Sequence, residues 1–290
     1  MVTRTALAGV LTGLFFTTLT GMPALGSPET NRVTVTLTPP KDAEHQYIYE
    51  LFKKRNVAGR LQEFLSPFRL PRTLNYVVAE CAGEADASYD EDSITMCYEY
   101  IDEMFDNMPS ETTPAGVAPM DAAVGPFFDT SLHEFGHALF DMLDLPVFGR
   151  EEDAADQVAA YIYLQLGQAE ARRLIMGTAY AYLTEAKGDD APRTAEEYSE
   201  DFAGEHSVPE QRAYNLLCMA YGADPKLFAD VVKSGQLPRE RADQCEDEYD
   251  QVGHAYDTLV GPHIDRALEK KILKRSWLRK PTAQIRRPGG

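Results

Sequence analysis

The sequence predicts an α+β fold in which a small sheet is followed by a mainly helical half. Strand-like alternation and short apolar runs fall before residue 100, whereas helical periodicity extends from about residue 120 to residue 270. A stretch rich in Pro and Gly, residues 108–118, separates the two regions and predicts a loop. With 290 residues, of which 44% are hydrophobic and 26% charged, the chain suits a globular protein.

The first region alternates between strands and helices. Residues 32–38 (RVTVTLT) alternate in polarity and end at two prolines, which predicts a strand. A turn-rich stretch over residues 83–92 separates two further strands. We therefore expect strands over residues 32–38, 73–80 and 92–97, and helices over residues 42–66 (one or two) and 98–107.

The first 26 residues have the organisation of a secretory signal peptide. Arg4 supplies a positive charge, and residues 6–20 form an uncharged apolar run. Small residues, Ala24 and Gly26, precede the expected cleavage point between Gly26 and Ser27. An uncleaved membrane anchor is the alternative, but the run is short for a span and is interrupted by Thr and Gly. The sequence therefore predicts a secreted or periplasmic protein with no membrane span after cleavage.

The charge balance excludes one class of function. The 28 Lys and Arg residues face 46 Asp and Glu residues, a net charge of −18, so no basic face is left for nucleic acid. We expect one domain over residues 27–270, sheet-containing to about residue 145 and helical beyond it. Residues 271–290 carry seven basic and no acidic side chains. We expect a frayed helix end and a solvated tail there, with docking onto the acidic body as the alternative.

Four cysteines allow three disulfide pairings in an exported chain. Cys81 and Cys97 each end an apolar, strand-like segment, so we expect them to meet across a short hairpin. Cys218 lies on a predicted helix and Cys245 in the next segment, so we favour this second local pair as well. Free buried thiols are the alternative, and no two cysteines have the C-x-x-C spacing of a zinc site.

Residues 133–137 read HEFGH, an H-E-x-x-H pattern. On a helix, His133 and His137 lie on one face, so both imidazoles can bind one metal ion. Glu134 is close enough to take a proton from a water on that metal, whose pKa Zn²⁺ lowers to about 7. The pattern predicts one Zn²⁺ per chain. An ordinary amphipathic helix with solvated histidines is the alternative.

The surroundings of this pattern support a helix. The helix is expected to end near Leu145, because the residue before Pro146 avoids the α region. Apolar side chains recur at helical spacing and predict a buried stripe, apart from the polar residues of the pattern: Phe128, Leu132, Phe135, Leu139 and Met142.

A catalytic zinc needs a third protein ligand, and the next predicted helix, residues 150–166, offers one. Glu152 and Asp156 are four residues apart on one face. Glu152 can then bind the metal while Asp156 accepts a hydrogen bond from the second ring nitrogen of His133. Alanines at 155, 159 and 160 would let the two helices approach closely. Glu151 is the competing ligand, and compensation of the helix dipole is the alternative role of these acids.

HEFGH followed by E-x-x-A-D, here Glu152 to Asp156, resembles the gluzincin group of zinc metallopeptidases, which use two His and one downstream Glu. The resemblance implies a zincin-like fold with HEFGH on its active-site helix, and peptide-bond hydrolysis. The longer metzincin pattern is absent, because Phe140 and Leu143 stand where its Gly and third His would be.

Further stretches resemble a mostly secreted bacterial family of metallopeptidases whose substrates are not established. These stretches are Glu80-Cys81, Cys97-Tyr98-Glu99, residues 132–160 and residues 205–218, the last through Glu205, His206, Ser207, Gln211, Arg212, Tyr214, Asn215 and Cys218.

Residues 205–222 predict a further helix with defined ends. Ser207 and Glu210 have the spacing of a capping box, and Gly222 suits the position just after the helix. Tyr214 is expected in the core.

His206 therefore lies just before the N-terminus of that helix. Gluzincins often place a His or Tyr where it stabilises the oxyanion, and His206 is the candidate here. Arg212 is the second candidate cation; a surface His and a structural Arg are the alternative reading. The remaining histidines, His45, His254 and His263, lack ligand partners at a recognisable spacing.

Together these expectations describe a secreted zinc metallopeptidase that acts on a peptide or protein. His133, His137 and Glu152 bind Zn²⁺, and Glu134 is the general base. A predicted edge strand at residues 92–97 would hold substrate as an added strand. One rival is a zincin-fold protein that binds zinc or a peptide without turnover. The other is a structural zinc site, which needs a fourth protein ligand that the sequence does not show.

Overall fold

The computed structural model of the protein describes residues 32–188, 194, 199 and 202–278. The strands in this range form one mixed sheet in the order β1-β2-β4-β3. β1, β2 and β4 run parallel, and β3 pairs antiparallel with β4. The predicted signal peptide, residues 1–26, lies outside the described residues. The strand bounds are β1 Val33–Leu37, β2 Leu74–Ala79, β3 Ala87–Asp90 and β4 Ser93–Cys97.

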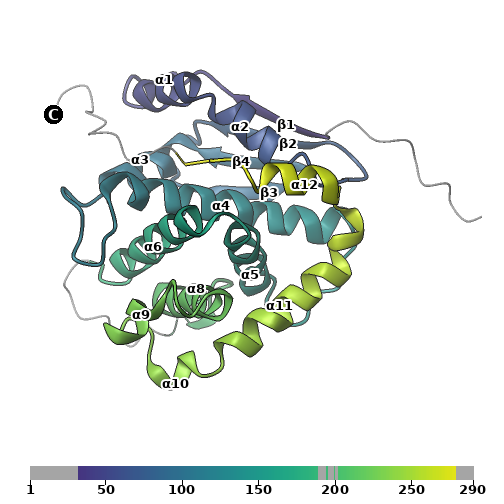
Figure 1. The fold of residues 1–290 in the computed structure, drawn as a ribbon. Helices are drawn as coiled ribbons and strands as arrows, with labels where there is room; N and C mark the ends of the chain where they lie inside the picture. Colours follow the sequence, from purple (N-terminus) through teal and green to yellow (C-terminus); the bar gives the residue numbers. More distant parts are fainter. Residues whose placement is uncertain (1–31, 189–193, 195–198, 200–201, 279–290) are drawn as a thin grey trace, which may run out of the picture. The chain divides into compact units, whose positions relative to one another are not determined.

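One face of this sheet is buried and the other is partly exposed. Alternate residues of β2 and β4 are fully buried, as the period of two in a strand requires. Among them, the Tyr76 hydroxyl lies 2.8 Å from Ser131 Oγ of the helix α4 (Pro119–Met142). The buried face therefore packs against α4, which lies below the sheet in Figure 1.

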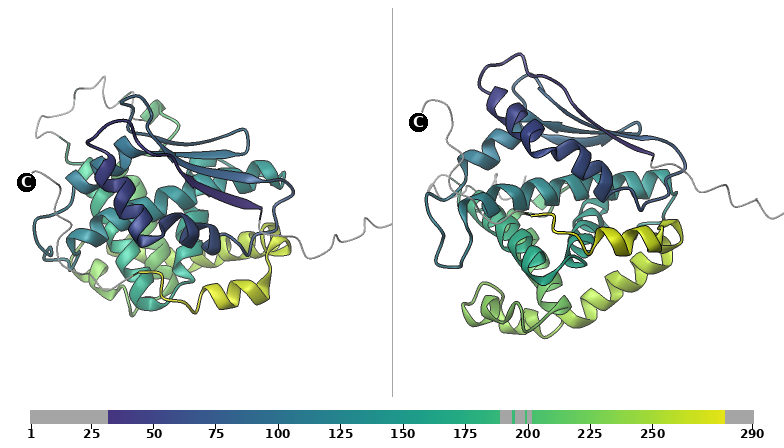
Figure 2. Two further views of the ribbon diagram at one scale, coloured as in Figure 1. Left: turned by 90° about the horizontal axis from the view of Figure 1, so that it is seen from above. Right: turned by 45° about the horizontal axis from the view of Figure 1, so that its top comes forward.

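Three short helices belong to the described part of the first region. α1 and α2 run along the β1 side of the sheet (Figure 2). Phe52 of α1 lies 5.3 Å from Phe127, and Phe64 of α2 lies 5.0 Å from Phe128, between ring centroids. The expected helical stretch over residues 42–66 is two helices because Asn56 takes a left-handed φ of 51°. Their bounds are α1 Gln46–Arg55, α2 Val57–Phe64 and α3 Tyr98–Asp106.

The helix α4 lies between two layers. The sheet covers one side, and α5 (Glu151–Leu164) and α6 (Gln168–Glu185) cover the other (Figure 1). The predicted apolar stripe is buried, which confirms it. Because α4 is covered from both sides, His133 and Glu134 are buried as well, with exposed fractions of 3% and 7%. The helix ends at Met142, three residues before the expected end.

Small residues allow the helices around α4 to approach closely. A Cβ on Gly136 of α4 would lie 3.1 Å from the Cα of Ala155 in α5, so the predicted close approach of these helices is present. The contact between α4 and α6 is tighter still. A Cβ on Gly177 would lie 2.0 Å from the carbonyl oxygen of Asp121, and one on Gly125 would lie 2.6 Å from the amide nitrogen of Thr178.

The chain then continues through a second group of helices. α8 packs against α5, α6 and α11, and it lies on the side of α5 and α6 away from the sheet (Figure 1). A short 3₁₀ helix, Gly261–His263, follows α11. The bounds are α8 Pro209–Ala223, α9 Ala229–Lys233, α10 Arg239–Ala242, α11 Cys245–Leu259 and α12 Arg266–Ile272.

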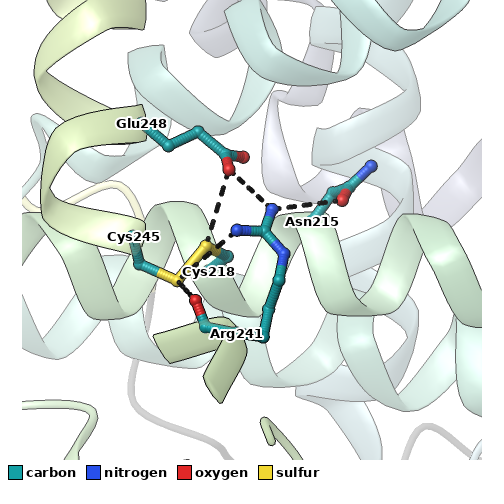
Figure 3. Close-up of a disulfide and its surroundings, with 5 residues drawn as sticks. All are labelled: Asn215, Cys218, Arg241, Cys245 and Glu248. Atoms are coloured by element: carbon teal, nitrogen blue, oxygen red, sulfur yellow. Dashed lines mark hydrogen bonds and ion pairs between the residues drawn. A yellow bond between two sulfur atoms is a disulfide. The ribbon is translucent and has the colours of Figure 1, made fainter. Parts of the chain in front are cut away.

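A disulfide joins α8 to the start of α11. Cys218 is bonded to Cys245, and Arg241 beside them forms a 2.6 Å ion pair with Glu248 (Figure 3). Gly222, expected just after α8, lies inside it. A Cβ on Gly222 would be 2.1 Å from the carbonyl oxygen of Cys245, so the glycine serves this close contact instead of ending the helix.

The second predicted disulfide, Cys81–Cys97, is also present, but its geometry differs from the expectation. The two cysteines do not meet across a hairpin. β2 and β4 run parallel with Ala79 opposite Cys97, so the same ends of both strands lie side by side. The expected turn over residues 83–92 contains β3, which forms one edge of the sheet. The expectation that residues 92–97 form an edge strand is therefore wrong, because β4 lies between β2 and β3.

The C-terminal segment packs onto α2, contrary to the expected solvated tail. Trp277 is 8% exposed, and its ring lies 5.2 Å from that of Phe64. The Arg60 guanidinium donates to the carbonyl oxygen of Trp277, and Arg275 forms an ion pair with Glu63. Residues 271–278 are thus docked, and residues 279–290 lie outside the described range. The solvated-tail prediction rested on the basic charge of the segment and did not consider the apolar surface of Trp277.

The mixed α+β class predicted from the sequence is confirmed, with a small sheet before a mainly helical remainder. No helix in the described part of the chain is both long enough and apolar enough to cross a bilayer.

We expect Gly177→Ala to lower the free energy of unfolding by about 1–3 kcal/mol, because its methyl group overlaps the backbone of α4. Gly167→Ala, at the start of the same helix with nothing within 4 Å, is the matched control and should cost less than about 1 kcal/mol. Urea denaturation of both variants measures the difference. Equal losses would contradict the close contact between α4 and α6.

Candidate functional site

Three side-chain atoms from two helices converge on one point. His133 and His137, one turn apart on α4, bring their Nε2 atoms within 3.2 Å of each other. Glu152, in the first turn of α5, places its Oε2 atom 3.0 Å from Nε2 of His133 and 3.3 Å from Nε2 of His137. The sequence-predicted pair of histidines and the predicted third ligand therefore form one triangle of lone-pair atoms.

Carboxylates hold the opposite nitrogen of each ring. Nδ1 of His133 lies 2.7 Å from Oδ1 of Asp156, and Nδ1 of His137 lies 2.8 Å from Oε1 of Glu151. Each carboxylate accepts a hydrogen bond from Nδ1, which leaves the lone pair of the neutral ring on Nε2. Glu151, the competing ligand predicted from the sequence, thus contacts Nδ1 of His137. Glu152 contacts Nε2 of both rings.

Arg212 of α8 lies behind this cluster. Its Nε and Nη2 atoms donate to the two oxygens of Asp156 at 2.8 and 2.7 Å, and its guanidinium lies 4.5 Å from the ring centroid of Tyr182. The two hydrogen bonds fix the plane of the Asp156 carboxylate. They also engage the guanidinium that the sequence offered as an oxyanion donor, so Arg212 acts on Asp156 and through it on His133.

The ionisation of the cluster follows from these contacts. Burial opposes a positive charge on His133, but its hydrogen bonds with Asp156 and Glu152 outweigh burial and raise its pKa to about 10. When both ring nitrogens of His133 are protonated, its hydrogen bond to Glu152 lowers the pKa of that carboxyl to about 2. Burial acts to raise the pKa of Asp156, but Arg212 and His133 hold it well below its usual range. These contacts therefore favour a positive charge at Nε2 of His133, carried by a proton or by a bound cation.

Glu134 has a different environment. Its side chain is buried beside the two histidines, and the described residues give its carboxylate no hydrogen-bond donor. Burial raises the pKa of Glu134, and the neighbouring His133 and His137 act against burial. The raised pKa makes this carboxylate a stronger base than that of an exposed glutamate.

His206 reaches the same point from outside α4 and α5. Its Nε2 atom lies 2.8 Å from Oε2 of Glu152, and its ring is stacked 5.8 Å from that of His133. Its side chain is 55% exposed, so the cluster opens to solvent on the side of His206. Arg212 and His206 are therefore brought to opposite sides of the cluster.

The segment around His206 is built differently from the expected capping box. α8 begins at Pro209 after Val208, and the Ser207 hydroxyl does not cap it. Ser207 Oγ instead donates to Oδ1 of Asp153 at 2.7 Å, because this carboxylate lies in the first turn of the neighbouring α5. Tyr214, expected in the core, is 40% exposed, so that expectation is wrong.

The donor set and its spacing suit a zinc ion. Two imidazole nitrogens and one carboxylate oxygen are ligands that zinc takes in catalytic sites. Bonds of about 2.0–2.1 Å at tetrahedral angles separate two ligand atoms by roughly 3.3 Å. The distances between the ligand atoms of His133, His137 and Glu152 are 3.0, 3.2 and 3.3 Å and lie near this value. His133, Glu152 and His206 also have ligand atoms within 4.8 Å of one another.

A second group of potential ligands, Cys81, Cys97 and Glu99, does not suit a metal. The two sulfurs are bonded to each other, so neither is a thiolate. The Glu99 carboxylate accepts backbone N–H bonds from Cys81 and Gly83 at 3.0 Å. These contacts give the group a structural role at the ends of β2 and β4.

Two contributors were missed from the sequence. Arg150 donates to the Gly204 carbonyl oxygen at 2.6 Å, and so connects the start of α5 to the segment that carries His206. Asp129, buried one turn before His133, accepts hydrogen bonds from Tyr163 at 2.9 Å and Tyr182 at 2.7 Å. The sequence signal for Asp129 is its position four residues before His133.

Comparison with protein-family models matches residues 37–260, more than half of the chain, to the family DUF4344, described as "Putative metallopeptidase". The matched span contains every residue of the converging cluster. No curated protein and no solved structure matches the chain.

Proposed function

The chain belongs to the DUF4344 family of metallopeptidases, and from this premise we propose that it is a gluzincin-type, zinc-dependent peptidase with a zincin-like fold. The observation that carries the proposal is the convergence of two Nε2 atoms and one carboxylate oxygen within 3.0–3.3 Å of one another. His133, His137 and Glu152 would hold one zinc ion, and a peptide or protein is the substrate class. Zinc fits this set because each histidine has its other nitrogen on a carboxylate.

Glu134 is the proposed general base. When bound, zinc supplies Lewis acidity, which lowers the pKa of a coordinated water to about 7 and polarises a carbonyl group. The Glu134 carboxylate would take the proton of the attacking water and return it to the leaving amine. Its burial beside His133 and its lack of a hydrogen-bond donor among the described residues support this role.

His206 and Arg212 have separate proposed roles. His206 lies on the solvent side of Glu152, where its ring can donate a hydrogen bond to the oxyanion of a tetrahedral intermediate. Arg212 is a positioning residue, because its guanidinium is engaged with Asp156 and reaches the reaction only through His133.

We further propose that the protein acts outside the cytosol, in the periplasm or the medium. Its two disulfides suit an oxidising compartment, and the charge pattern of residues 1–26 suits export.

Glu134→Gln tests the general base. We expect hydrolysis of a fluorescently labelled unfolded protein to fall by about 10²–10⁴-fold, while zinc content measured by elemental mass spectrometry stays near one per chain. Glu103→Gln, an exposed change on α3, is the matched control and should leave both unchanged. Full activity in Glu134→Gln, or loss of its metal, would refute the assignment.

Glu152→Ala tests the third ligand against its neighbour Glu151. We expect the purified Glu152→Ala variant to hold much less than one zinc, because it loses an oxygen that lies within 3.3 Å of both imidazoles. Glu151→Ala removes only the partner behind His137, so its zinc affinity should fall by about 10–100-fold with the site still filled in excess zinc. The reverse order would make Glu151 the ligand. Absence of zinc from the folded wild-type protein would refute the proposal.

His206→Ala separates the open catalytic site from a closed structural one. We expect a loss of about 10²–10³-fold in kcat with the zinc content unchanged, since an oxyanion donor does not hold the metal. The exposed His254→Ala in α11 is the matched control. Loss of zinc together with activity would make His206 a fourth ligand and would favour a structural site.

A further inference from the structure

An apolar cavity of about 220 Å³ lies on α4 away from the converging cluster. Its walls come from α1, α2, α3, the first half of α4, Arg173 of α6 and the docked C-terminal segment. On α4 it is lined by Val124 and Phe127 and extends to Phe128, whereas the site residues begin at His133, roughly 7–8 Å further along the helix axis. The site side chains contact α5 and α8, so the cavity and the site are separate.

The charged residues around this cavity all have one sign. Among its 17 lining residues, 14 are apolar and three are arginines, and none is acidic. This is unexpected in a chain with 46 acidic and 28 basic residues. The three cations are Arg55, Arg60 and Arg173.

The three arginines differ in their partners. Arg173 is paired with Asp121 at 2.6 Å. Arg60 donates to backbone carbonyl oxygens of Ser276 and Trp277 and lies over the Trp277 ring. Within the described residues, no carboxylate compensates the charge of Arg60. The described part of the chain gives the Arg55 guanidinium neither an ion pair nor a side-chain hydrogen bond. Two positive charges therefore border an apolar space without an internal anion.

We propose that this cavity binds a single-chain anionic amphiphile, a medium-chain fatty acid in its simplest form, with its carboxylate at Arg55 and its chain against Phe127 and Trp277. The volume of the cavity limits the size of the ligand. It exceeds the roughly 150 Å³ of an apolar cavity that holds benzene, and it is below the roughly 300–1,000 Å³ of a site for a drug-sized ligand. One alkyl chain suits this space, whereas a two-chain lipid exceeds it.

Charge complementarity also favours an anionic ligand over residues 279–290 as the occupant of the cavity. Residues 279–290, which continue from the cavity-lining Leu278, contain four basic residues and no acidic residue. Their charge repels that of Arg55 and Arg60. An exogenous carboxylate is the complementary occupant.

The single tryptophan of the chain, Trp277, lines the cavity and reports on its contents. Titration of the purified protein with 12-bromododecanoate, kept below its micelle concentration, should quench tryptophan fluorescence and saturate at one ligand per chain. The uncharged 12-bromododecanol should bind at least about tenfold more weakly, because it lacks a charge-assisted hydrogen bond. The readout does not involve hydrolysis or zinc, so its failure is distinct from failure of the peptidase proposal.

Two variants assign the binding to this cavity. Arg55→Gln should weaken binding of the carboxylate about tenfold or more and leave binding of the alcohol unchanged. Lys54→Gln, one residue away on the same helix, exposed and outside the cavity, should change neither. Val124→Phe should abolish quenching by filling the space.

Three outcomes would overturn the proposal. They are quenching that does not saturate, carboxylate binding that Arg55→Gln leaves unchanged, and quenching that appears only after removal of residues 279–290, which would assign the cavity to the tail.

Discussion

The burial of ionisable side chains between α4 and α5 is the constraint on which the rest of the structure depends. The contact of Gly136 with Ala155 brings the two helices together, so the carboxylates of α5 reach the histidines of α4. A buried carboxylate such as Asp156 is costly unless it is paired and hydrogen-bonded. His133 and Arg212 both bond to Oδ1 of Asp156, and Arg212 bonds to Oδ2 as well. The close packing of two helices therefore determines where α8 must lie, because α8 carries the compensating cation.

The same requirement extends outward from Arg212. Its guanidinium lies over Tyr182, whose hydroxyl donates to the buried Asp129 on α4. α8 is held at its far end by the Cys218–Cys245 disulfide and by the close approach of Gly222 to α11. α4, α6 and α8 are thus connected by polar contacts near the cluster, and α8 is joined to α11 by covalent and steric contacts away from it. Removal of one partner would leave a buried charge without compensation, which costs more than the pair itself contributes.

The sequence predicted those parts of the site that depend on spacing within one helix. The separation of four residues in HEFGH, and again between Glu152 and Asp156, determines which side chains share a face. Contacts between distant segments could not be read in this way. Ser207 has the sequence of a cap, but the nearby Asp153 takes its hydroxyl. The cysteines at the ends of β2 and β4 were paired correctly for the wrong reason, because strand direction depends on partners far along the chain.

The length of α4 explains how one helix can serve two different environments. Its 24 residues span about 36 Å, so its two halves meet different neighbours. The first half packs against the rings of α1 and α2, where apolar side chains leave a cavity between them. The second half lies against the acidic first turn of α5, where histidine and glutamate find partners. The two halves differ in what lies beside the cavity and the cluster and not in overall polarity, because Asp129 is buried in the first half and Leu139 in the second. In α4 each half matches the elements that cover it, and this division keeps an apolar cavity apart from a charged cluster on the same helix.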